Sequence, residues 1–404
     1  MRCANCSIST WGRKRMSVRR LKSSVRRSWK VVTKILTAGN LQAWLDSLVA
    51  AHEVYAPVEG EGASSFKKID KGQMPAMDIR TDTPPKGLIF KQVEKILSFE
   101  VNPDGITVMP GDENGTKKVV FGIRPCDSRS FTLTDKPFFD PQMPENQYMA
   151  QRNASALVTT ACTSACRTCF CTSIGGAPDE KTGDVWMMDI DGKYLVESLT
   201  DKGEELIKAN ESLFSDASAD DEAAAKRIGE EVANSMPKIN IADAKALDAL
   251  FNDDAFWQKL TDKCLSCGAC TFVCPTCYCF DVRDEGNTRK GERYRGWDSC
   301  MFYQYNRAAG GHNPREFHWK RMRQRMLHKF SYFPEKYGDI DCVGCGRCIR
   351  SCPVSYDLRD FLEGSLEATG AMPVGFEKEL SDVDEKDRSC EIKQADEAVT
   401  TGGV

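Results

Sequence analysis

The sequence lacks several features that would assign it to common classes of protein. No window approaches 18 uninterrupted apolar residues, so no segment is predicted to span a membrane. No secretory leader precedes the cysteines, which argues against an exported disulfide scaffold and for a reducing, cytoplasmic compartment. No glycine-rich dinucleotide fingerprint follows a predicted strand, and no P-loop occurs. The chain itself is therefore not expected to bind a flavin or NAD, or to hydrolyse a nucleotide.

The charge of the chain is unevenly distributed. The 404 residues are 41% hydrophobic and 28% charged, which is ordinary for a soluble globular protein with room for two or three domains. Residues 1–30 carry ten Lys and Arg and no acid, so the net charge of −4 leaves −14 for the remainder. We interpret this head as a flexible extension or a start codon placed too far upstream, with a nucleic-acid-binding arm as the alternative. Its Cys3 and Cys6 have no second pair nearby and are not expected to bind a metal.

Two cysteine runs dominate the second half of the chain. The first reads CLSCGACTFVC over residues 264–274, followed by proline, and its spacing returns in CVGCGRCIRSC over residues 342–352, also followed by proline. This is the spacing of bacterial ferredoxins, in which each run gives three thiolates to one 4Fe–4S cube and the fourth to the other. The runs therefore predict two cubes, one held by Cys264, Cys267, Cys270 and Cys352 and the other by Cys342, Cys345, Cys348 and Cys274.

Structural zinc and disulfides are the alternative interpretations of these runs, because paired cysteines at this spacing also bind zinc. A zinc site takes four ligands from two pairs, whereas each run here has a third cysteine in step and a fourth before proline. The spacing thus favours iron–sulfur clusters and, with them, electron transfer.

Five further cysteines follow two predicted strands in the first half of the chain. Residues 119–123 and 156–160 are predicted to be strands, and strand ends are where α/β proteins present site residues. Zinc and a set of inert buried thiols are possible interpretations of these cysteines. We predict instead a third iron–sulfur cluster held by Cys126, Cys162, Cys169 and Cys171, with Cys166 left over.

The 67 residues between Cys274 and Cys342 are predicted to be helical. Asn313 and Pro314 offer an N-cap and a first helical position. We interpret the basic residues of this region as stabilising anionic clusters or contacting a partner, with nucleic-acid binding as the alternative. These residues are Arg293, Arg295, Arg315, Lys320, Arg321, Arg323, Arg325 and Lys329.

Three cysteines of the cluster region, Cys277, Cys279 and Cys300, lie outside the two runs. They line a further cluster or a redox site, or they are packed thiols, and the sequence leaves these alternatives open. His312 and His328 are interpreted as structural groups, and Cys390 as an incidental thiol in a flexible end.

The predicted fold is an α+β or α/β domain followed by an α-helical dicluster ferredoxin domain. A strand at 31–36 leads to a helix with Asn40 as its N-cap, and strands at 99–101 and 106–109 follow. The acidic residues of 201–235 are interpreted as the solvated face of a helix. The predicted divisions are a basic extension 1–30, an α/β domain 31–250, a cluster domain 251–367 and an acidic flexible tail 368–404.

The order of these motifs resembles one family: the iron–sulfur beta subunits of soluble NAD(P)-linked nickel–iron hydrogenases (sulfhydrogenases) and the corresponding iron–sulfur component of anaerobic sulfite reductase. The chain departs from the family pattern in its basic head, its additional Cys166 and its acidic tail, and the second departure leaves the third ligand set open. The matching stretches are Cys162 and residues 122–127, 168–173, 274–281, 295–302, 310–315 and 342–348.

The resemblance implies an electron-transfer subunit of an anaerobic oxidoreductase complex. Such a subunit relays single electrons between a flavin- and NAD(P)-binding partner and a catalytic subunit of the sulfite reductase or hydrogenase type, and is not expected to be an enzyme alone. The alternatives are an iron–sulfur component of a heterodisulfide-reductase-associated complex, a direct reductase of sulfur compounds that uses its cysteines, and a zinc-dependent interaction or nucleic-acid-binding protein. We expect the chain neither to bind nucleic acid nor to span a membrane.

Overall fold

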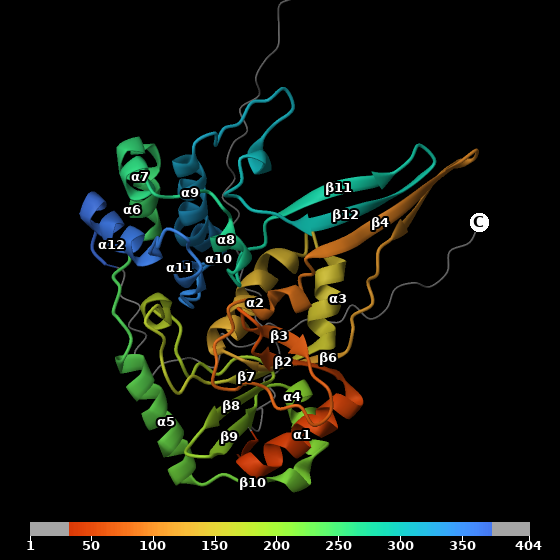
Figure 1. Ribbon diagram of the computed structural model, residues 1–404, viewed down its shortest axis with the longest axis vertical. Helices are drawn as coiled ribbons and strands as arrows, with labels where there is room; N and C mark the ends of the chain where they lie inside the picture. Colours follow the sequence, from red (N-terminus) through yellow and green to blue (C-terminus); the bar gives the residue numbers. More distant parts are fainter. Residues whose placement is uncertain (1–31, 374–404) are drawn as a thin grey trace, which may run out of the picture. The chain divides into compact units, whose positions relative to one another are not determined.

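The computed structural model describes residues 32–373, and its first half is built on an eight-stranded mixed sheet (Figure 1). The strand order is β10-β1-β9-β8-β7-β6-β2-β3, in which β2, β6, β7 and β8 are parallel neighbours. The strands are β1 (Thr33–Thr37), β2 (Glu53–Val58), β3 (Ser65–Lys68), β6 (Lys118–Ile123), β7 (Ser155–Thr160), β8 (Val185–Asp189), β9 (Lys193–Ser198) and β10 (Phe214–Asp216).

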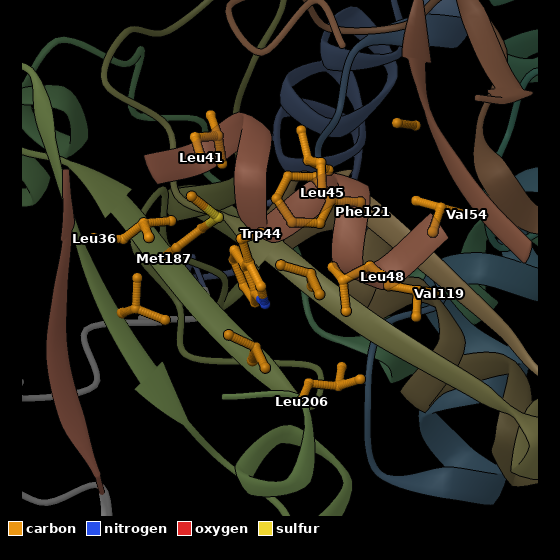
Figure 2. Close-up of a cluster of buried hydrophobic side chains, with 14 of the residues drawn as sticks. Leu36, Leu41, Trp44, Leu45, Leu48, Val54, Val119, Phe121, Met187 and Leu206 are labelled. Atoms are coloured by element: carbon orange, nitrogen blue, oxygen red, sulfur yellow. The ribbon is translucent and has the colours of Figure 1, made fainter. Parts of the chain in front are cut away.

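The central strands β6 and β7 are buried along their whole length, as expected for strands covered on both faces. Helix α1 packs Trp44 edge-on against Phe121 of β6, with ring centroids 5.4 Å apart (Figure 2). The preceding residue of β6, Val120, lies in a separate apolar cluster with Phe131 and Tyr148. The helices of this half are α1 (Ala38–Ala51), α2 (Pro125–Phe138), α3 (Asn146–Ala154), α4 (Asp201–Lys208) and α5 (Ala219–Asn234), with single turns η1 (Pro85–Leu88), η2 (Cys171–Ile174) and η3 (Glu211–Leu213).

A second, four-stranded antiparallel sheet joins distant parts of the sequence in the order β11-β12-β4-β5. Its strands, which lie side by side in Figure 1, are β4 (Val93–Asn102), β5 (Gly105–Pro110), β11 (Phe280–Gly286) and β12 (Lys290–Trp297). The prediction that all of the region between the cysteine runs is helical is therefore wrong for the β11–β12 hairpin. The physical reason is long-range pairing with β4, because buried Arg295 of β12 pairs with buried Glu94 of β4.

The remaining elements carry the two cysteine runs and pack around buried Trp257, Trp319 and Phe361. A π-helical turn, η6 (His328–Tyr332), directly follows helix α9, and such turns are frequent at functional sites. These elements are α6 (Ala244–Ala249), η4 (Leu250–Asn252), α7 (Asp254–Leu260), α8 (Ala269–Phe272), η5 (Gln304–Asn306), α9 (His318–Leu327), α10 (Phe333–Tyr337), α11 (Arg347–Arg350) and α12 (Leu358–Thr369).

Two predicted helix starts are displaced in the structure. Helix α1 begins after Thr37 rather than Asn40, and the side chain of Asn40 donates to the carbonyl of Leu213 instead. Helix α9 begins after Phe317, and Asn313 instead lies in a turn, where its side-chain oxygen accepts from the N–H of Arg315 at 2.9 Å and its side-chain nitrogen donates to the carbonyl of Tyr303 at 2.7 Å. Neither side chain caps the helix to which the pattern assigned it.

Several predictions fall outside the described part of the chain. The basic extension 1–30 with Cys3 and Cys6, and the tail beyond residue 373 with Cys390, lie there. Within residues 32–373, none of the helices is both long enough and apolar enough to cross a bilayer. The boundary expected at residue 250 remains a prediction, and the four-stranded sheet takes strands from both sides of it.

Candidate iron–sulfur site

The first cysteine group surrounds a cavity. Cys264, Cys267 and Cys270 of the first run line it together with Cys352 of the second, the set expected to hold one cube. The cavity opens to solvent on one side. The backbone N–H groups of Ser266 and Tyr356 donate to the sulfurs of Cys264 and Cys352, at 3.5 and 3.3 Å. The structure thus brings together four thiols from two segments that are far apart in the sequence.

Arg325 tests whether these residues fit an anionic cluster. Its side chain lines the same cavity and is only 3% exposed, yet among residues 32–373 it pairs with no carboxylate, and its Nε has no hydrogen-bond partner. Burial lowers the pKa of Arg325, but negative charge at Cys270 and Cys348 outweighs burial and raises that pKa well above its usual value. A buried guanidinium needs an anionic neighbour. An iron–sulfur cube ligated by four thiolates supplies that charge, so the donor set and the cation fit it.

The second cysteine group lies deeper in the protein. Cys342, Cys345 and Cys274 are buried and Cys348 is half-buried. Burial raises the pKa of Cys342 to about 12, while the ammonium of Lys329 acts in the opposite direction. The charge of Cys274, from the first run, acts on each of the other three thiols, so it lies close to them. Such thiols become thiolates only beside a metal or fixed cations.

A buried ion pair closes one side of the second group. Lys329 donates to the carboxylate of Asp341 at 3.0 Å and to the hydroxyl of Thr276 at 2.8 Å, and both charged side chains are at most 2% exposed. The Thr276 hydroxyl in turn lies 3.4 Å from the sulfur of Cys274. The pair therefore connects the end of the first run to the residue that precedes Cys342.

The third group gathers after strand β7. Cys162, Cys166, Cys169 and Cys171 share one apolar cluster with Met236, whereas Cys126, at the start of α2, contacts the cluster of Cys345. Burial raises the pKa of Cys171 to about 12. The predicted placement at strand ends is therefore observed, because β6 and β7 are adjacent parallel strands.

Arg80 lies among the thiols of the third group. Its guanidinium donates to the sulfur of Cys169, and its Nε has no partner. Burial lowers the pKa of Arg80, but the charges of Cys126, Cys169 and Cys162 raise it above its usual value. Arg80 is half-buried, unlike Arg325, and a cation whose neighbours are thiols fits an anionic cluster.

The second and third groups touch through their backbones. The N–H of Phe170 donates to the carbonyl of Gly344 at 3.0 Å. Gly344 has φ +61°, and a Cβ there would stand 2.5 Å from the nitrogen of Cys171; at Gly346, with φ +71°, it would stand 2.3 Å from the carbonyl oxygen of Thr168. Only glycine allows both the conformation and the approach.

A second buried ion pair holds this junction. Arg347 of α11 is fully buried and donates two bonds to Asp127 of α2, one of them at 2.8 Å. The Nε of Arg347 also donates to the carbonyl of Thr81 at 2.8 Å. The second run is thereby fixed against the residue that follows Cys126.

The three cysteines outside the runs separate into two places. The backbone N–H of Cys277 donates to the carbonyl of Cys274 at 3.4 Å, and the carbonyl of Cys277 accepts from buried Lys86 at 2.9 Å. Cys279 and Cys300 lie after the first run, on either side of the β11–β12 hairpin, where the N–H of Asp298 donates to the carbonyl of Cys279 at 2.9 Å. In residues 32–373, no three His, Cys, Asp or Glu side chains form a group placed to hold one metal ion.

Comparison with known proteins adds two matches. Residues 263–356 match the family model of the 4Fe-4S dicluster domain. Sulfhydrogenase 2 subunit beta from Pyrococcus furiosus is 31% identical to this chain over 306 residues, which cover 74% of this chain and 88% of that protein. The chain belongs to the sulfhydrogenase beta-subunit family. The resemblance stated from the motifs is confirmed.

Some of the residues that surround the cysteines in this chain were predicted from the motifs, and others were not. Arg325 and Lys329 were among the basic residues expected near clusters, and they do face the thiols. Arg293 instead forms an exposed pair with Asp284. Arg80 and Tyr356 were missed, because a single Arg or Tyr outside the cysteine spacing carries no sequence signal.

Proposed function

We propose that the chain is an electron-transfer subunit of an anaerobic oxidoreductase complex. It relays single electrons between a flavin- and NAD(P)-binding partner and a catalytic subunit of the hydrogenase or sulfite reductase type. Cys264, Cys267, Cys270 and Cys352 would hold one 4Fe–4S cube, and Cys342, Cys345, Cys348 and Cys274 the other. When bound, each cube supplies a one-electron carrier. The chain alone catalyses no complete reaction in this proposal. Its proposed location is the cytoplasm.

The observation that carries the proposal is the continuous succession of the three cysteine groups. The third group contacts the second where Phe170 bonds Gly344, and Cys348 lies both in the second group and on the wall of the first cavity. Cys274 acts electrostatically on Cys270 as well as on Cys342. A relay requires such neighbouring sites, whereas separate structural metal sites do not.

The proposed third cluster, held by Cys126, Cys162, Cys169 and Cys171, stands at one end of this succession. Its support is Arg80, whose charge lies among three of the four proposed ligands. Cys166 is half-buried, and its N–H donates to the sulfur of Cys169 at 3.2 Å. The charge of Cys166 also acts on Arg80, so Arg80 does not separate Cys166 from the four, and Cys166 is the spare thiol of this proposal.

The basic residues between the runs favour this function over nucleic-acid binding. Arg295 is buried against Glu94, Arg321 bonds the carbonyl of Met301, and Arg325 lines the first cavity. Charges used inside the protein do not form a surface for phosphates. The alternative of a direct sulfur-compound reductase would use the N-terminal cysteines or Cys277, Cys279 and Cys300. The alternative of a heterodisulfide-reductase-associated component differs from the proposal in the terminal electron acceptor.

Metal and spin analysis of the full chain tests the proposal. Protein prepared without oxygen should contain about eight irons per chain for two cubes and about twelve with a third, with matching acid-labile sulfide. Dithionite should produce paramagnetic signals of reduced clusters at low temperature. Cys267→Ser and Cys345→Ser should each remove the signal of a different cube, whereas Cys390→Ser serves as the matched control. Zinc in place of iron, or full iron in both variants, would refute the ligand assignment.

A further inference from the structure

Lys86 is a buried lysine without a carboxylate partner. It lies in the turn η1 and is only 5% exposed, and among residues 32–373 it forms no ion pair. Its ammonium donates to the carbonyl of Cys277 at 2.9 Å and to that of Thr271 at 3.2 Å, and it stands 4.3 Å from the centroid of the Trp297 ring. All three neighbours attract a cation, yet none carries the negative charge that a buried ammonium requires.

The two carbonyls lie at the ends of the segment that joins the first and second cysteine groups. Thr271 directly follows Cys270, a proposed ligand of the first cube, and Cys277 lies three residues after Cys274. Cys274 is the cysteine of the first run that is proposed to bind the second cube. Lys86, from a distant part of the sequence, therefore holds both ends of this crossing segment, residues 271–277.

The negative charge that Lys86 lacks lies in the direction of the second cysteine group. Burial lowers the pKa of Lys86, whereas negative charge at Cys277 and Cys274 acts in the opposite direction. A cube ligated by four thiolates is anionic. Bound at the second group, it would supply the counter-charge that the residues around Lys86 do not provide.

We propose that Lys86 is a positioning residue of the electron relay, which fixes the crossing segment and raises the reduction potential of the second cube. This inference rests on the proposed function. One-electron reduction adds a negative charge to a cube, so a fixed cation beside Cys274 favours the reduced state. Loss of that cation should therefore make the second cube harder to reduce.

Lys118 provides a matched control in the same half of the chain. It is 6% exposed, and its ammonium likewise donates to two neutral oxygens, the carbonyl of Leu88 at 2.7 Å and the side-chain amide of Gln151 at 2.9 Å. The charged groups that act on it are one lysine and two glutamates. Removal of its charge should disturb the protein much as at Lys86, without an effect on a cube.

Redox titration of the full chain, prepared without oxygen and followed by paramagnetic resonance, tests the proposal. Lys86→Gln removes the charge but keeps a donor, Lys86→Arg keeps the charge, and Lys118→Gln is the control. The second cube is identified by the signal that Cys345→Ser removes. At a fixed potential, Lys86→Gln should lower the ratio of reduced to oxidised second cube roughly tenfold, which is about 59 mV for a one-electron couple. Lys86→Arg and Lys118→Gln should leave that ratio nearly unchanged.

The outcomes separate a role of the charge from a role in packing. No fall in Lys86→Gln at unchanged iron content, or an equal fall in Lys118→Gln, would overturn the proposal. If Lys86→Gln lost the iron of the second group, Lys86→Arg would decide: retained iron and an unchanged potential support the charge, and loss of iron in both variants would overturn it. An unchanged chain without cluster signals after dithionite would refute the proposed function, and this inference with it.

Discussion

The first and second cysteine groups share one spacing but lie in different surroundings. In the first, Cys267 is exposed and its neighbour Leu265 is 66% exposed, beside a cavity that opens to solvent. In the second, three thiols are buried, and two buried ion pairs, Lys329 with Asp341 and Arg347 with Asp127, lie next to them. The same cysteine spacing thus lies once near the surface and once in the interior.

This difference assigns different tasks to the two groups in the proposed relay. A cluster near the surface can exchange electrons with a partner, whereas a cluster in the interior can only pass them on. Fixed cations around the interior group stabilise the reduced, more anionic state without help from water. The comparison predicts that changes near the second group disturb folding and electron transfer together, while changes near the first alter the potential alone.

The largest expected effect on stability is at the ion pair between Arg347 and Asp127, beside the second cysteine group. Arg347→Met should lower the free energy of unfolding by about 3–5 kcal/mol, because it leaves the carboxylate of Asp127 buried without its partner. Anaerobic thermal unfolding measures the loss. Arg350→Met, on the same helix, is the matched control: its contact with Asp82, at 3.9 Å, is partly exposed, so the loss should be about 0–1 kcal/mol. Equal losses in both variants would contradict the special role of the buried pair.

The junction between the second and third groups should give a smaller effect. Gly344→Ala places a Cβ 2.5 Å from the nitrogen of Cys171, in addition to the strain of a left-handed backbone. Gly370→Ala, at φ +62° with nothing within 4 Å of its Cβ, carries the strain alone, about 1–2 kcal/mol. Only Gly344→Ala should also reduce the iron bound by the third group, as measured by iron content and paramagnetic resonance. An unchanged iron content would show that the close contact does not matter for that site.

Part of this contrast could be predicted from the sequence. The spacing of Cys264, Cys267 and Cys270 led to the expectation of a fourth thiol from the other run, and the structure does place Cys352 at the same cavity. The apolar segments before Cys126 and Cys162 were predicted to be strands, and β6 and β7 are there. Local patterns sufficed in both cases because spacing and apolar runs are properties of short segments.

The surroundings of the cysteines could not be predicted, because they depend on contacts between distant segments. Arg295 was expected to be a cation beside a cluster, but it pairs with Glu94, 201 residues earlier in the sequence. The segment that contains it was expected to be helical and instead forms strand β12 against β4. Arg80 and Asp127, whose charges act on nearby thiols, carry no local sequence signal of those contacts.

The smallest expected effect concerns the first cysteine group, which lies near the surface. Tyr356 lines its cavity, and the hydroxyl of Tyr356 is buried without a hydrogen-bond partner. With a cluster bound in this cavity, the Tyr356 hydroxyl would be a donor available to its sulfurs, and hydrogen bonds to cluster sulfurs raise the reduction potential. Tyr356→Phe should therefore lower the potential of the cube in the first group and leave that of the second unchanged, as measured by a redox titration followed by paramagnetic resonance. Stability should change little, because no hydrogen bond within the protein is lost. Tyr303→Phe, at an exposed tyrosine, should shift neither potential, and an equal shift in both cubes would contradict the separation between surface and interior groups.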